Sequence, residues 1–471
     1  MAGRADRLMK HHFHPTILRS YDIRGQVGKT LSTDDAFAIG AGFGQQIKST
    51  SKGRIAVGRD GRLSSPDLSA ALIDGLCRAG CHVFDIGVGP TPMLYFADRH
   101  LGCDGAIQVT GSHNPPDYNG FKMVRAHQSY FGSDIQELGE ACAAGLSLVQ
   151  TGSAEPISVF DAYVDRLRQN IDFGAFTVVW DAGNGAAGPA VEALVKPISG
   201  NHKTLFTDID GQFPNHHPNP VDPSTLKFLT EQVHAATADC GIGFDGDGDR
   251  IGVIDRNGRQ VSGDLLTAFI SLDILDRHQG ADILFDVKSS STALDLVRRA
   301  GGTPHLWRTG HSHMKQRLKE LGAPLAGEMS GHIFIADDFY GFDDALYVAC
   351  RFLSRLSYMA QNTNETLSDF LDQLPPSFTT AECHISCPDE EKFAAIERLS
   401  QQISAVMPAD QINLIDGVRL TTDQGWCLIR ASNTEPALVA RAEGKNEAAL
   451  DEMICVLRTH LADAGISWDG P

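Results

Sequence analysis

Short apolar runs that end in polar turns recur along the chain and predict β-strands. An opening run appears three times, at residues 55–60, 178–181 and 283–286. A second run follows each of them, at residues 82–87, 205–208 and 303–307. Segments with helical spacing lie between the runs, as at 68–78 and 292–299. Strands that alternate with helices predict βαβ units with mainly parallel sheets, whose ligands bind beyond the carboxyl ends of the strands.

A third apolar run in each unit leads into a polar loop that contains glycine. These loops are Thr-Gly-Ser-His-Asn-Pro at 110–115, Asp-Gly-Asp-Gly-Asp-Arg at 245–250 and Gly-Glu-Met-Ser-Gly-His at 327–332. After a linker at 373–378 the pattern changes to strand, helix, two strands and a final helix at 447–464. The prediction is an α/β protein with three similar domains, at 1–155, 156–258 and 259–372, and a smaller α+β domain at 377–471.

Length and composition limit the classes of protein that fit. A chain of 471 residues with 42% hydrophobic and 21% charged residues is typical of a globular protein with several domains. Since no apolar run has the length of a membrane span or of a secretory signal, we expect no membrane partner and a cytoplasmic location. The net charge of −19 makes nucleic acid an improbable partner. The ten scattered cysteines are expected to be buried free thiols.

Three carboxylates at alternate positions form the clearest chemical motif. Asp245, Asp247 and Asp249 are separated by glycines, which permit the tight backbone path needed to wrap one cation. An EF-hand is excluded, because Arg250 and Arg256 stand where glycine and glutamate are required. The alternative, an acidic turn without metal, would leave three carboxylates repelling each other. The motif therefore predicts a Mg²⁺ site.

A second motif offers a nucleophile. Ser112 precedes His113, and Lys122 follows shortly, so a hydroxyl, a proton acceptor and a cation are close in sequence. The elbow of serine hydrolases is disfavoured, since Thr110 and Asn114 replace its glycines. Taken alone, this segment is equally compatible with a Ser/Asn/Pro-rich turn.

Two further segments admit more than one interpretation. Residues 183–188 satisfy a dinucleotide-binding fingerprint, and Asp208 follows at about the sequence spacing expected for the acidic residue that binds the ribose. An NAD-dependent oxidoreductase therefore stays an alternative. A strand-to-helix turn without cofactor explains the same glycines. Residues 430–434, Arg-Ala-Ser-Asn-Thr, carry the donors that a phosphate dianion requires, or form a capped turn.

Taken together, these motifs resemble the α-D-phosphohexomutase family, and most closely its bacterial phosphomannomutase/phosphoglucomutase branch. The matching segments are 21–25, 57–60, 110–122, 214–220, 245–250, 286–288, 309–311, 327–332 and 430–436. The resemblance implies four domains around a central cleft. It also implies reversible transfer of a phosphoryl group between the 1- and 6-positions of mannose or glucose, through phosphoserine and a hexose 1,6-bisphosphate.

The resemblance also assigns roles to individual residues. It implies that Ser112 carries the phosphoryl group and that Asp245, Asp247 and Asp249 hold Mg²⁺ against it. The other catalytic residues would be Arg24, His113, Lys122 and Arg250. Substrate binding would fall to Tyr21, Lys288, Gly310, His311, Glu328, Ser330, His332, Arg430, Ser432, Asn433 and Thr434.

Within the family, the rival is a phosphoglucosamine mutase, whose sugar loop usually has glutamine where this chain has Met329. The expected partners are small hexose phosphates, and the expected state is a monomer or weak homo-oligomer.

Overall fold

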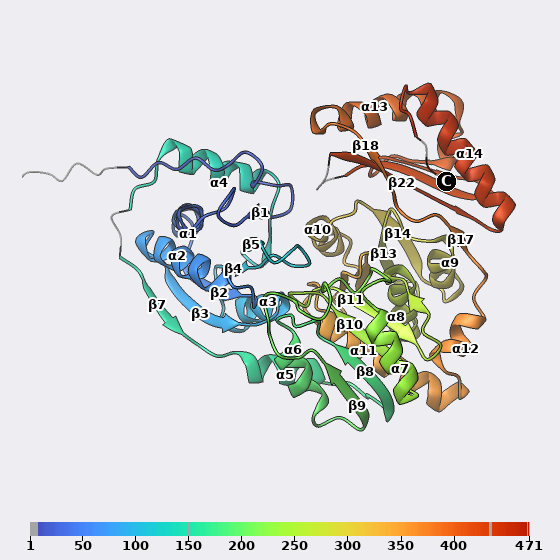
Figure 1. The fold of residues 1–471 in the computed structure, drawn as a ribbon, viewed down its shortest axis with the longest axis horizontal. Coiled ribbons are helices and arrows are strands. Elements are labelled where there is room, and N and C mark those ends of the chain that lie inside the picture. The colour runs from blue at the N-terminus through green and yellow to red at the C-terminus, as the bar shows by residue number, and fades with distance from the viewer. Residues whose placement is uncertain (1–7, 149–150, 433–435, 469, 471) are drawn as a thin grey trace, which may run out of the picture. The chain divides into compact units, whose positions relative to one another are not determined.

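The computed structural model describes residues 8–148, 151–432, 436–468 and 470 (Figure 1). By its internal contacts the chain divides into two compact units. The first unit contains Met1–Ile270 and Ser330–Ser368, and the second contains Ser271–Met329 and Asp369–Pro471. Among the described residues, no helix combines the length and the apolar character that crossing a membrane requires.

The first sheet of the first unit is mixed. Its strands are β1 (Ile23–Gln26), β2 (Arg54–Arg59), β3 (His82–Val88), β4 (Gly105–Val109), β5 (Tyr118–Arg125), β6 (Gln128–Tyr130) and β7 (Ser153–Pro156). The order is β1-β5-β4-β2-β3-β7, with β6 beside β5. The pairs among β4, β2, β3 and β7 are parallel, whereas β5 is antiparallel to its neighbours. The helices that accompany this sheet are α1 (Thr33–Lys48), α2 (Ser65–Arg78), α3 (Thr91–His100) and α4 (Ser133–Ala144).

The second sheet repeats the plan with fewer strands. They are β8 (Phe176–Asp181), β9 (Gly200–Leu205), β10 (Cys240–Phe244), β11 (Ile251–Asp255) and β12 (Gln260–Val261), in the order β12-β11-β10-β8-β9. β10, β8 and β9 run parallel, and β11 is antiparallel to β10. The helices here are α5 (Phe160–Arg168), α6 (Gly188–Val195) and α7 (Lys227–Ala236). The next helix, α8 (Gly263–Arg277), contains the boundary between the two units.

The strand expected at 205–208 is placed wrongly. The observed strand β9 ends at Leu205, and Phe206 has a φ of 52°, which no strand residue adopts. β9 lies at the edge of its sheet, and most of its residues are exposed or half-buried. Its polar sequence, Asn-His-Lys-Thr, therefore hid it from a search for apolar runs.

In the second unit, β13 (Asp282–Asp286) pairs in parallel with β14 (Thr303–Trp307) and with β15 (Leu325–Gly327). The helices between these strands are α9 (Ser291–Arg299) and α10 (His311–Leu321). Of the remaining elements before the last domain, β16 (Ile333–Ile335) and α11 (Ala345–Thr363) belong to the first unit, and α12 (Leu367–Asp372) contains the boundary between the units.

The last domain, also in the second unit, has an antiparallel sheet. Its strands are β17 (Phe378–Thr379), β18 (Cys383–Ser386), β19 (Ile412–Asn413), β20 (Val418–Thr421), β21 (Gly425–Ala431) and β22 (Ala437–Gly444). The order is β17-β22-β21-β20-β19, and β18 also pairs with β22. The helices α13 (Asp389–Val406) and α14 (Glu447–Asp463) cover one face of this sheet (Figure 1). They pack on a hydrophobic core that includes Leu399, Ile429 and Leu457. A short 3-10 helix spans Ala409–Gln411.

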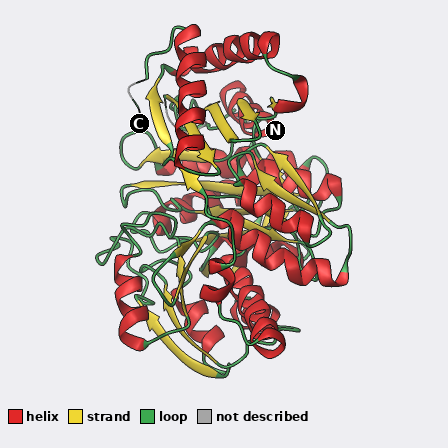
Figure 2. Ribbon diagram, turned by 90° about the vertical axis from the view of Figure 1, so that its right-hand side faces the viewer, coloured by secondary structure: helices red, strands yellow, loops and turns green. Residues whose placement is uncertain are grey.

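The predicted fold class is confirmed. Three mixed α/β domains with parallel strands precede a smaller C-terminal domain, and Figure 2 shows helices packed beside the strands throughout. The ten cysteines are free, as predicted, although Cys455 is exposed and Cys77 and Cys383 are only half-buried. Desolvation by burial raises the pKa of buried thiols such as Cys81, to about 12, which keeps them protonated.

Candidate active site

Ser112 lies in the turn between β4 and β5 and is 3% exposed. Its hydroxyl donates a hydrogen bond to Oδ2 of Asp245 at 3.1 Å and lies 3.2 Å from Nδ1 of His113. The backbone of Ser112 has a φ of 49°, a left-handed conformation that costs a residue other than glycine roughly 1–3 kcal/mol. The surrounding structure must hold this conformation in place.

Arg62 supplies much of that support. Its guanidinium is completely buried and donates to the carbonyl oxygens of Ser112 (2.7 Å) and Asn114 (2.6 Å), and to those of Pro115 and Tyr118. Asp60 accepts hydrogen bonds from the Arg62 backbone and side chain and, in addition, from Thr110 Oγ1 and Gly111 N. The pair therefore fixes the serine loop mainly through its backbone groups, together with the hydroxyl of Thr110.

The aspartate loop connects β10 to β11 and lies against the serine loop. Asp245 accepts backbone hydrogen bonds from Asp249 (3.0 Å) and Arg250 (3.1 Å), so its carboxylate closes the turn. Gly246 faces the serine loop so closely that a β-carbon there would lie 2.5 Å from the carbonyl oxygen of Ser112. Gly248 has a φ of 73°, which favours glycine.

The three aspartates fit a divalent cation. They are fully buried, and one oxygen of each lies within 4.8 Å of one oxygen of the others. Among the described residues, Oδ1 of Asp247 and Oδ1 of Asp249 have no hydrogen-bond partner despite their burial. Buried carboxylate oxygens without donors are costly, and hard oxygen ligands of this kind suit Mg²⁺.

Lys122, on β5, joins this cluster. Its ammonium donates to Oδ2 of Asp247 at 2.7 Å and to Oδ2 of Asp249. Although burial opposes its charge, the neighbouring carboxylates raise the pKa of Lys122 above its ordinary value. Burial and the charges of Asp249 and Asp247 raise the pKa of Asp245 well above its usual range, since one ammonium does not balance three carboxylates.

Two arginines give the serine loop a positive environment. Arg24, on β1, donates to the carbonyl oxygen of Gly111 at 2.6 Å and to Oδ1 of Asn114 at 2.7 Å. The positive charge of Arg250, burial and the charge of Arg24 lower the pKa of His113 well below its usual value. His113 is therefore a neutral imidazole near neutral pH.

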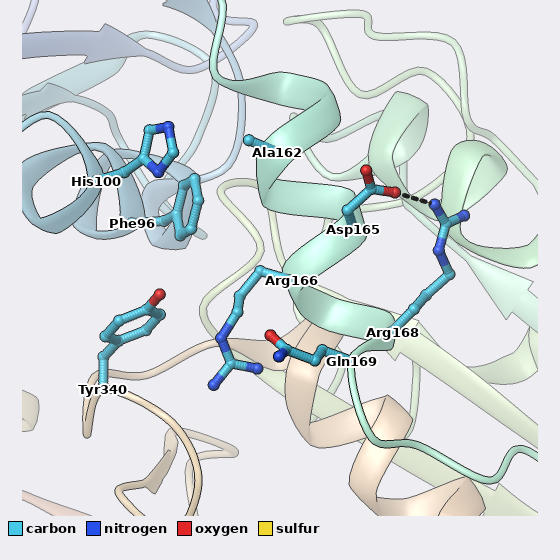
Figure 3. Close-up of a pocket in the computed structure, with 8 residues that line it drawn as sticks. All are labelled: Phe96, His100, Ala162, Asp165, Arg166, Arg168, Gln169 and Tyr340. Carbon is cyan, nitrogen blue, oxygen red and sulfur yellow. Dashed lines mark hydrogen bonds and ion pairs between the residues drawn. The ribbon is translucent and has the colours of Figure 1, made fainter.

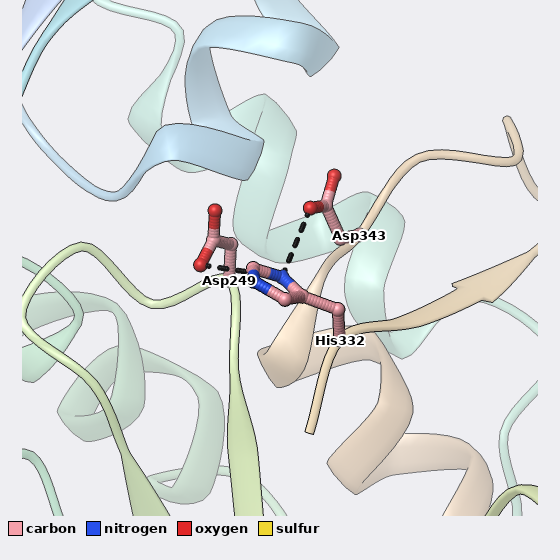
Figure 4. Close-up of side chains that lie close together, drawn as sticks. All are labelled: Asp249, His332 and Asp343. Carbon is pink, nitrogen blue, oxygen red and sulfur yellow. Dashed lines mark ion pairs between the residues drawn. The ribbon is translucent and has the colours of Figure 1, made fainter. Parts of the chain in front are cut away.

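Figure 4 shows how His332 lies between two carboxylates. Nδ1 of His332 lies 3.1 Å from Oδ2 of Asp343 and 3.6 Å from Oδ1 of Asp249. Nε2 of His332 accepts a hydrogen bond from Nε of Arg250 at 2.9 Å. Because the guanidinium is always a donor, the ring proton is assigned to Nδ1, on the side of the carboxylates.

The second unit holds another group of the predicted residues. Lys288, which follows β13, pairs with Glu382 at 2.7 Å. Glu328, after β15, is 1% exposed and accepts a hydrogen bond from the backbone of Gly310. Arg430, at the end of β21, pairs through Nε with Asp416 at 2.9 Å.

The remaining predicted residues are placed as follows. Tyr21 and Ser330 are half-buried in the first unit, His311 is half-buried at the start of α10, and Ser432 is buried after β21. Asn433 and Thr434 lie outside the described residues.

Four family models match consecutive parts of the chain. They describe α/β/α domains I, II and III and the C-terminal domain of phosphoglucomutase/phosphomannomutase, at residues 15–145, 161–258, 262–378 and 382–455. The chain belongs to the phosphoglucomutase/phosphomannomutase family.

Individual relatives agree with this family. A phosphomannomutase/phosphoglucomutase of Pseudomonas aeruginosa is 42% identical over 95% of each chain. A phosphoglucomutase of Neisseria gonorrhoeae is 38% identical over 93% of this chain and 95% of its own. A crystal structure of a phosphoglucomutase/phosphomannomutase family protein from Burkholderia thailandensis matches with a TM-score of 0.89 and 41% identity, covering 96% of this chain and 98% of its own.

For a member of this family, the glycine-rich segment 183–188 needs no nucleotide. The amide of Ala186 donates to the carbonyl oxygen of Gly246 at 2.9 Å. A β-carbon on Gly185 would lie 2.9 Å from that same oxygen, and one on Gly188 would lie 2.0 Å from the carbonyl oxygen of Thr207. The glycines thus allow close backbone packing against the aspartate loop and against the segment after β9, which accounts for the fingerprint.

A cavity of about 560 Å³ in the first unit involves none of the predicted residues (Figure 3). It is lined by Phe96, His100, Ala162, Asp165, Arg166, Arg168, Gln169 and Tyr340. Arg168 pairs with Asp165, and Arg166 lies over the rings of Phe339 and Tyr340. Arg166 therefore packs α5 against the segment before α11, whereas Arg168 contacts Asp165 of its own helix and the carbonyl oxygen of Ala193.

Sequence reasoning missed several residues that shape the site. Asp60 belongs to a matching segment but received no role, and Arg62, Thr91 and Asp343 were not singled out. Thr91 donates from its hydroxyl to Asp247, and its amide donates to the Asp247 carbonyl at 2.8 Å. The charged pair at 60 and 62 was a signal that could have been used, because two charges directly after a buried strand demand partners.

Proposed function

We propose that this chain is a Mg²⁺-dependent phosphohexomutase that interconverts the 1-phosphates and 6-phosphates of glucose and mannose through a phosphoryl group on Ser112. The observation that carries the proposal is the hydrogen bond from Ser112 to Asp245, the first of three buried carboxylates, of which the other two, Asp247 and Asp249, share the ammonium of Lys122. The names of the P. aeruginosa and N. gonorrhoeae relatives support the choice of sugars.

Asp245, Asp247 and Asp249 are the residues that would hold Mg²⁺. When bound, the ion neutralises charge on the transferring phosphoryl group. The chain's own contribution is a set of fixed charges around Ser112. Lys122, held as an ammonium, and the guanidinium groups of Arg24 and Arg250 stabilise the spread-out negative charge of the transfer.

The proton in this reaction needs an acceptor. In this mechanism His113, whose Nδ1 lies 3.2 Å from the Ser112 oxygen, takes the proton of an attacking hydroxyl, and Lys122 donates one. His332 holds the Nε side of Arg250 and thereby orients its guanidinium.

The reaction conserves phosphate. The Ser112 phosphoester breaks as the substrate's free hydroxyl takes the phosphoryl group, which gives a hexose 1,6-bisphosphate. After the sugar reverses its orientation, the other phosphate returns to the Ser112 oxygen and the isomeric monophosphate leaves. No nucleotide is consumed, and the bisphosphate in trace amounts would restore the phosphorylated enzyme.

Substrate contacts come from further residues in this proposal. Glu328 and Ser330 read the sugar hydroxyls, and Arg430 binds the phosphate that is not reacting. Ser432, Asn433 and Thr434 complete the phosphate site. The pocket lining would come from Tyr21, Lys288, Gly310, His311 and His332. Since glucose and mannose differ only at C2, hydroxyl contacts elsewhere on the ring permit both sugars.

An assay with glucose 1-phosphate and mannose 1-phosphate, Mg²⁺ and a trace of the hexose 1,6-bisphosphate tests this function. We expect the 6-phosphate of each sugar, and little product from glucosamine 1-phosphate. Ser112→Ala should abolish turnover, whereas Ser404→Ala, an exposed serine on α13, should match the unmodified chain. Turnover by Ser112→Ala would overturn the mechanism, and a preference for glucosamine 1-phosphate in kcat/KM would assign the chain to the rival substrate.

A further inference from the structure

In the second unit, one carboxylate oxygen of Asp416 accepts hydrogen bonds from two segments, one that carries Arg430 and one that carries Thr309. Oδ2 of Asp416 accepts a hydrogen bond from Nε of Arg430 at 2.9 Å and another from the backbone amide of Thr309 at 3.1 Å. The side chain of Asp416 is 16% exposed and that of Arg430 is 7% exposed. The carboxylate therefore joins the proposed phosphate ligand to the segment that precedes α10.

The turn that carries Asp416 is held tightly against Arg430. Gly417 has a φ of 78°, and a β-carbon there would lie 2.2 Å from the Ile429 carbonyl oxygen and 2.6 Å from Cα of Arg430. The side chain of Asn413 accepts a hydrogen bond from the amide of Ile415 at 3.0 Å, which closes the turn. Only glycine at position 417 lets Asp416 reach the Arg430 guanidinium in this way.

The turn that carries Asp416 also contacts the segment before α10 through its backbone. Nε of Arg308 donates to the carbonyl oxygen of Ile415 at 3.0 Å, next to the bond from Thr309 to Asp416. The following amide, that of Gly310, donates to the buried carboxylate of Glu328. Three hydrogen bonds and the peptide link between Thr309 and Gly310 thus connect Arg430 through Asp416 to Glu328.

We propose that Asp416 is a positioning residue that couples phosphate binding by Arg430 to sugar recognition by Glu328. The proposal rests on the function proposed above, because that function gives these two residues their roles. Asp416 fixes the guanidinium at Nε and fixes the 309–310 backbone with the same oxygen. Loss of the bond from Arg430 to Asp416 loosens the 309–310 backbone, and loss of the bond from Thr309 to Asp416 loosens Arg430. The phosphate and the sugar of a hexose phosphate are therefore bound cooperatively.

The first test measures binding of glucose 1-phosphate by calorimetry, which does not depend on turnover. Asp416→Ala should raise the Kd by about 10- to 100-fold, the loss expected for a charged hydrogen bond. Asp416→Asn keeps an acceptor oxygen and should lose less. Asp423→Asn, which removes an exposed carboxylate from the same domain, is the matched control and should leave the Kd unchanged.

Inorganic phosphate, used as a second probe, separates positioning from general loosening of the domain. It meets only the phosphate end, so Asp416→Ala should weaken its binding less than that of glucose 1-phosphate. Equal losses for both probes, or an unchanged Kd for glucose 1-phosphate, would overturn the coupling. If Asp416→Ala does not fold, as judged by thermal unfolding, the comparison is made with Asp416→Asn.

Double-mutant cycles make the claim sharper. Asp416→Asn is combined with Arg430→Gln and, separately, with Glu328→Gln, and the changes in Kd for glucose 1-phosphate are compared. Coupling predicts that the effects are less than multiplicative in both cycles, whereas multiplicative effects in either cycle overturn it. A chain that binds glucose 1-phosphate with these couplings but does not isomerise it would refute the proposed function alone.

Discussion

Replacing Gly246 by alanine perturbs the contact between the aspartate loop and the serine loop. The new β-carbon would lie 2.5 Å from the Ser112 carbonyl oxygen, where ordinary contact begins at 3.4 Å. The two loops must therefore separate by about 0.9 Å, a displacement of the size that costs about a hundredfold in rate when it misplaces reacting groups. Arg62 holds the same carbonyl oxygen at 2.7 Å, so the serine loop cannot move without losing that bond as well.

We expect Gly246→Ala to lower kcat about a hundredfold and to reduce the free energy of unfolding by about 1–3 kcal/mol, the usual cost of overpacking. Gly243→Ala is the matched control on the preceding strand β10. A β-carbon there meets only side-chain atoms at 3.5 and 3.6 Å, which is ordinary van der Waals contact. That variant should retain turnover.

The assay follows conversion of glucose 1-phosphate to glucose 6-phosphate, together with thermal unfolding and the mass of the Ser112 peptide. Gly246→Ala should stay folded and fail in turnover. Wild-type kcat in a folded Gly246→Ala protein would refute the reasoning, because the distance between the loops would then not govern the reaction.

Three more predictions concern other parts of the site. Arg62→Lys keeps the charge but loses the fork that holds four carbonyl oxygens, so denaturant unfolding should show a loss of roughly 3 kcal/mol and phosphorylation of Ser112 should slow. Removal of divalent cations by a chelator should stop turnover, and Mg²⁺ should restore it in the unmodified chain. Asp247→Asn should need a higher Mg²⁺ concentration for the same turnover. Full activity in excess chelator would contradict this prediction. Burial raises the pKa of Asp344 to about 7, so the free energy of unfolding should fall by roughly 4 kcal/mol as the pH rises from about 4 to about 7. Asp344→Asn should not show this fall, and melting temperatures of both proteins measured across that pH range test the difference.

The sequence was informative where one loop carries several reactive groups. The serine loop, the aspartate loop and the loop at 327–332 follow β4, β10 and β15, each in its own sheet, and ligands of parallel sheets bind at such carboxyl ends of strands. Spacing alone predicted that Asp245, Asp247 and Asp249 share a cation, and their oxygens do lie within 4.8 Å of one another. The partners of these loops were not predictable in the same way.

Arg62 and Asp416 illustrate the reason. Arg62 acts on carbonyl oxygens about fifty residues away, and Asp416 acts on an amide more than a hundred residues away. In these hydrogen bonds one partner is a backbone group, which every residue has. The sequence of the bound segment therefore does not indicate which side chain binds it. The error at β9 has another physical origin, since an edge strand exposed to water can be polar and still pair fully on its inner side.

The most direct test of the central claim is a rapid-quench measurement on protein phosphorylated with radioactive phosphate at Ser112. After glucose 1-phosphate is added with Mg²⁺, the label should leave Ser112 in a single turnover and appear in glucose 1,6-bisphosphate and glucose 6-phosphate, at a rate no slower than kcat. If unlabelled glucose 6-phosphate formed at the steady-state rate while the label stayed on Ser112, phosphoryl transfer through this serine would be contradicted.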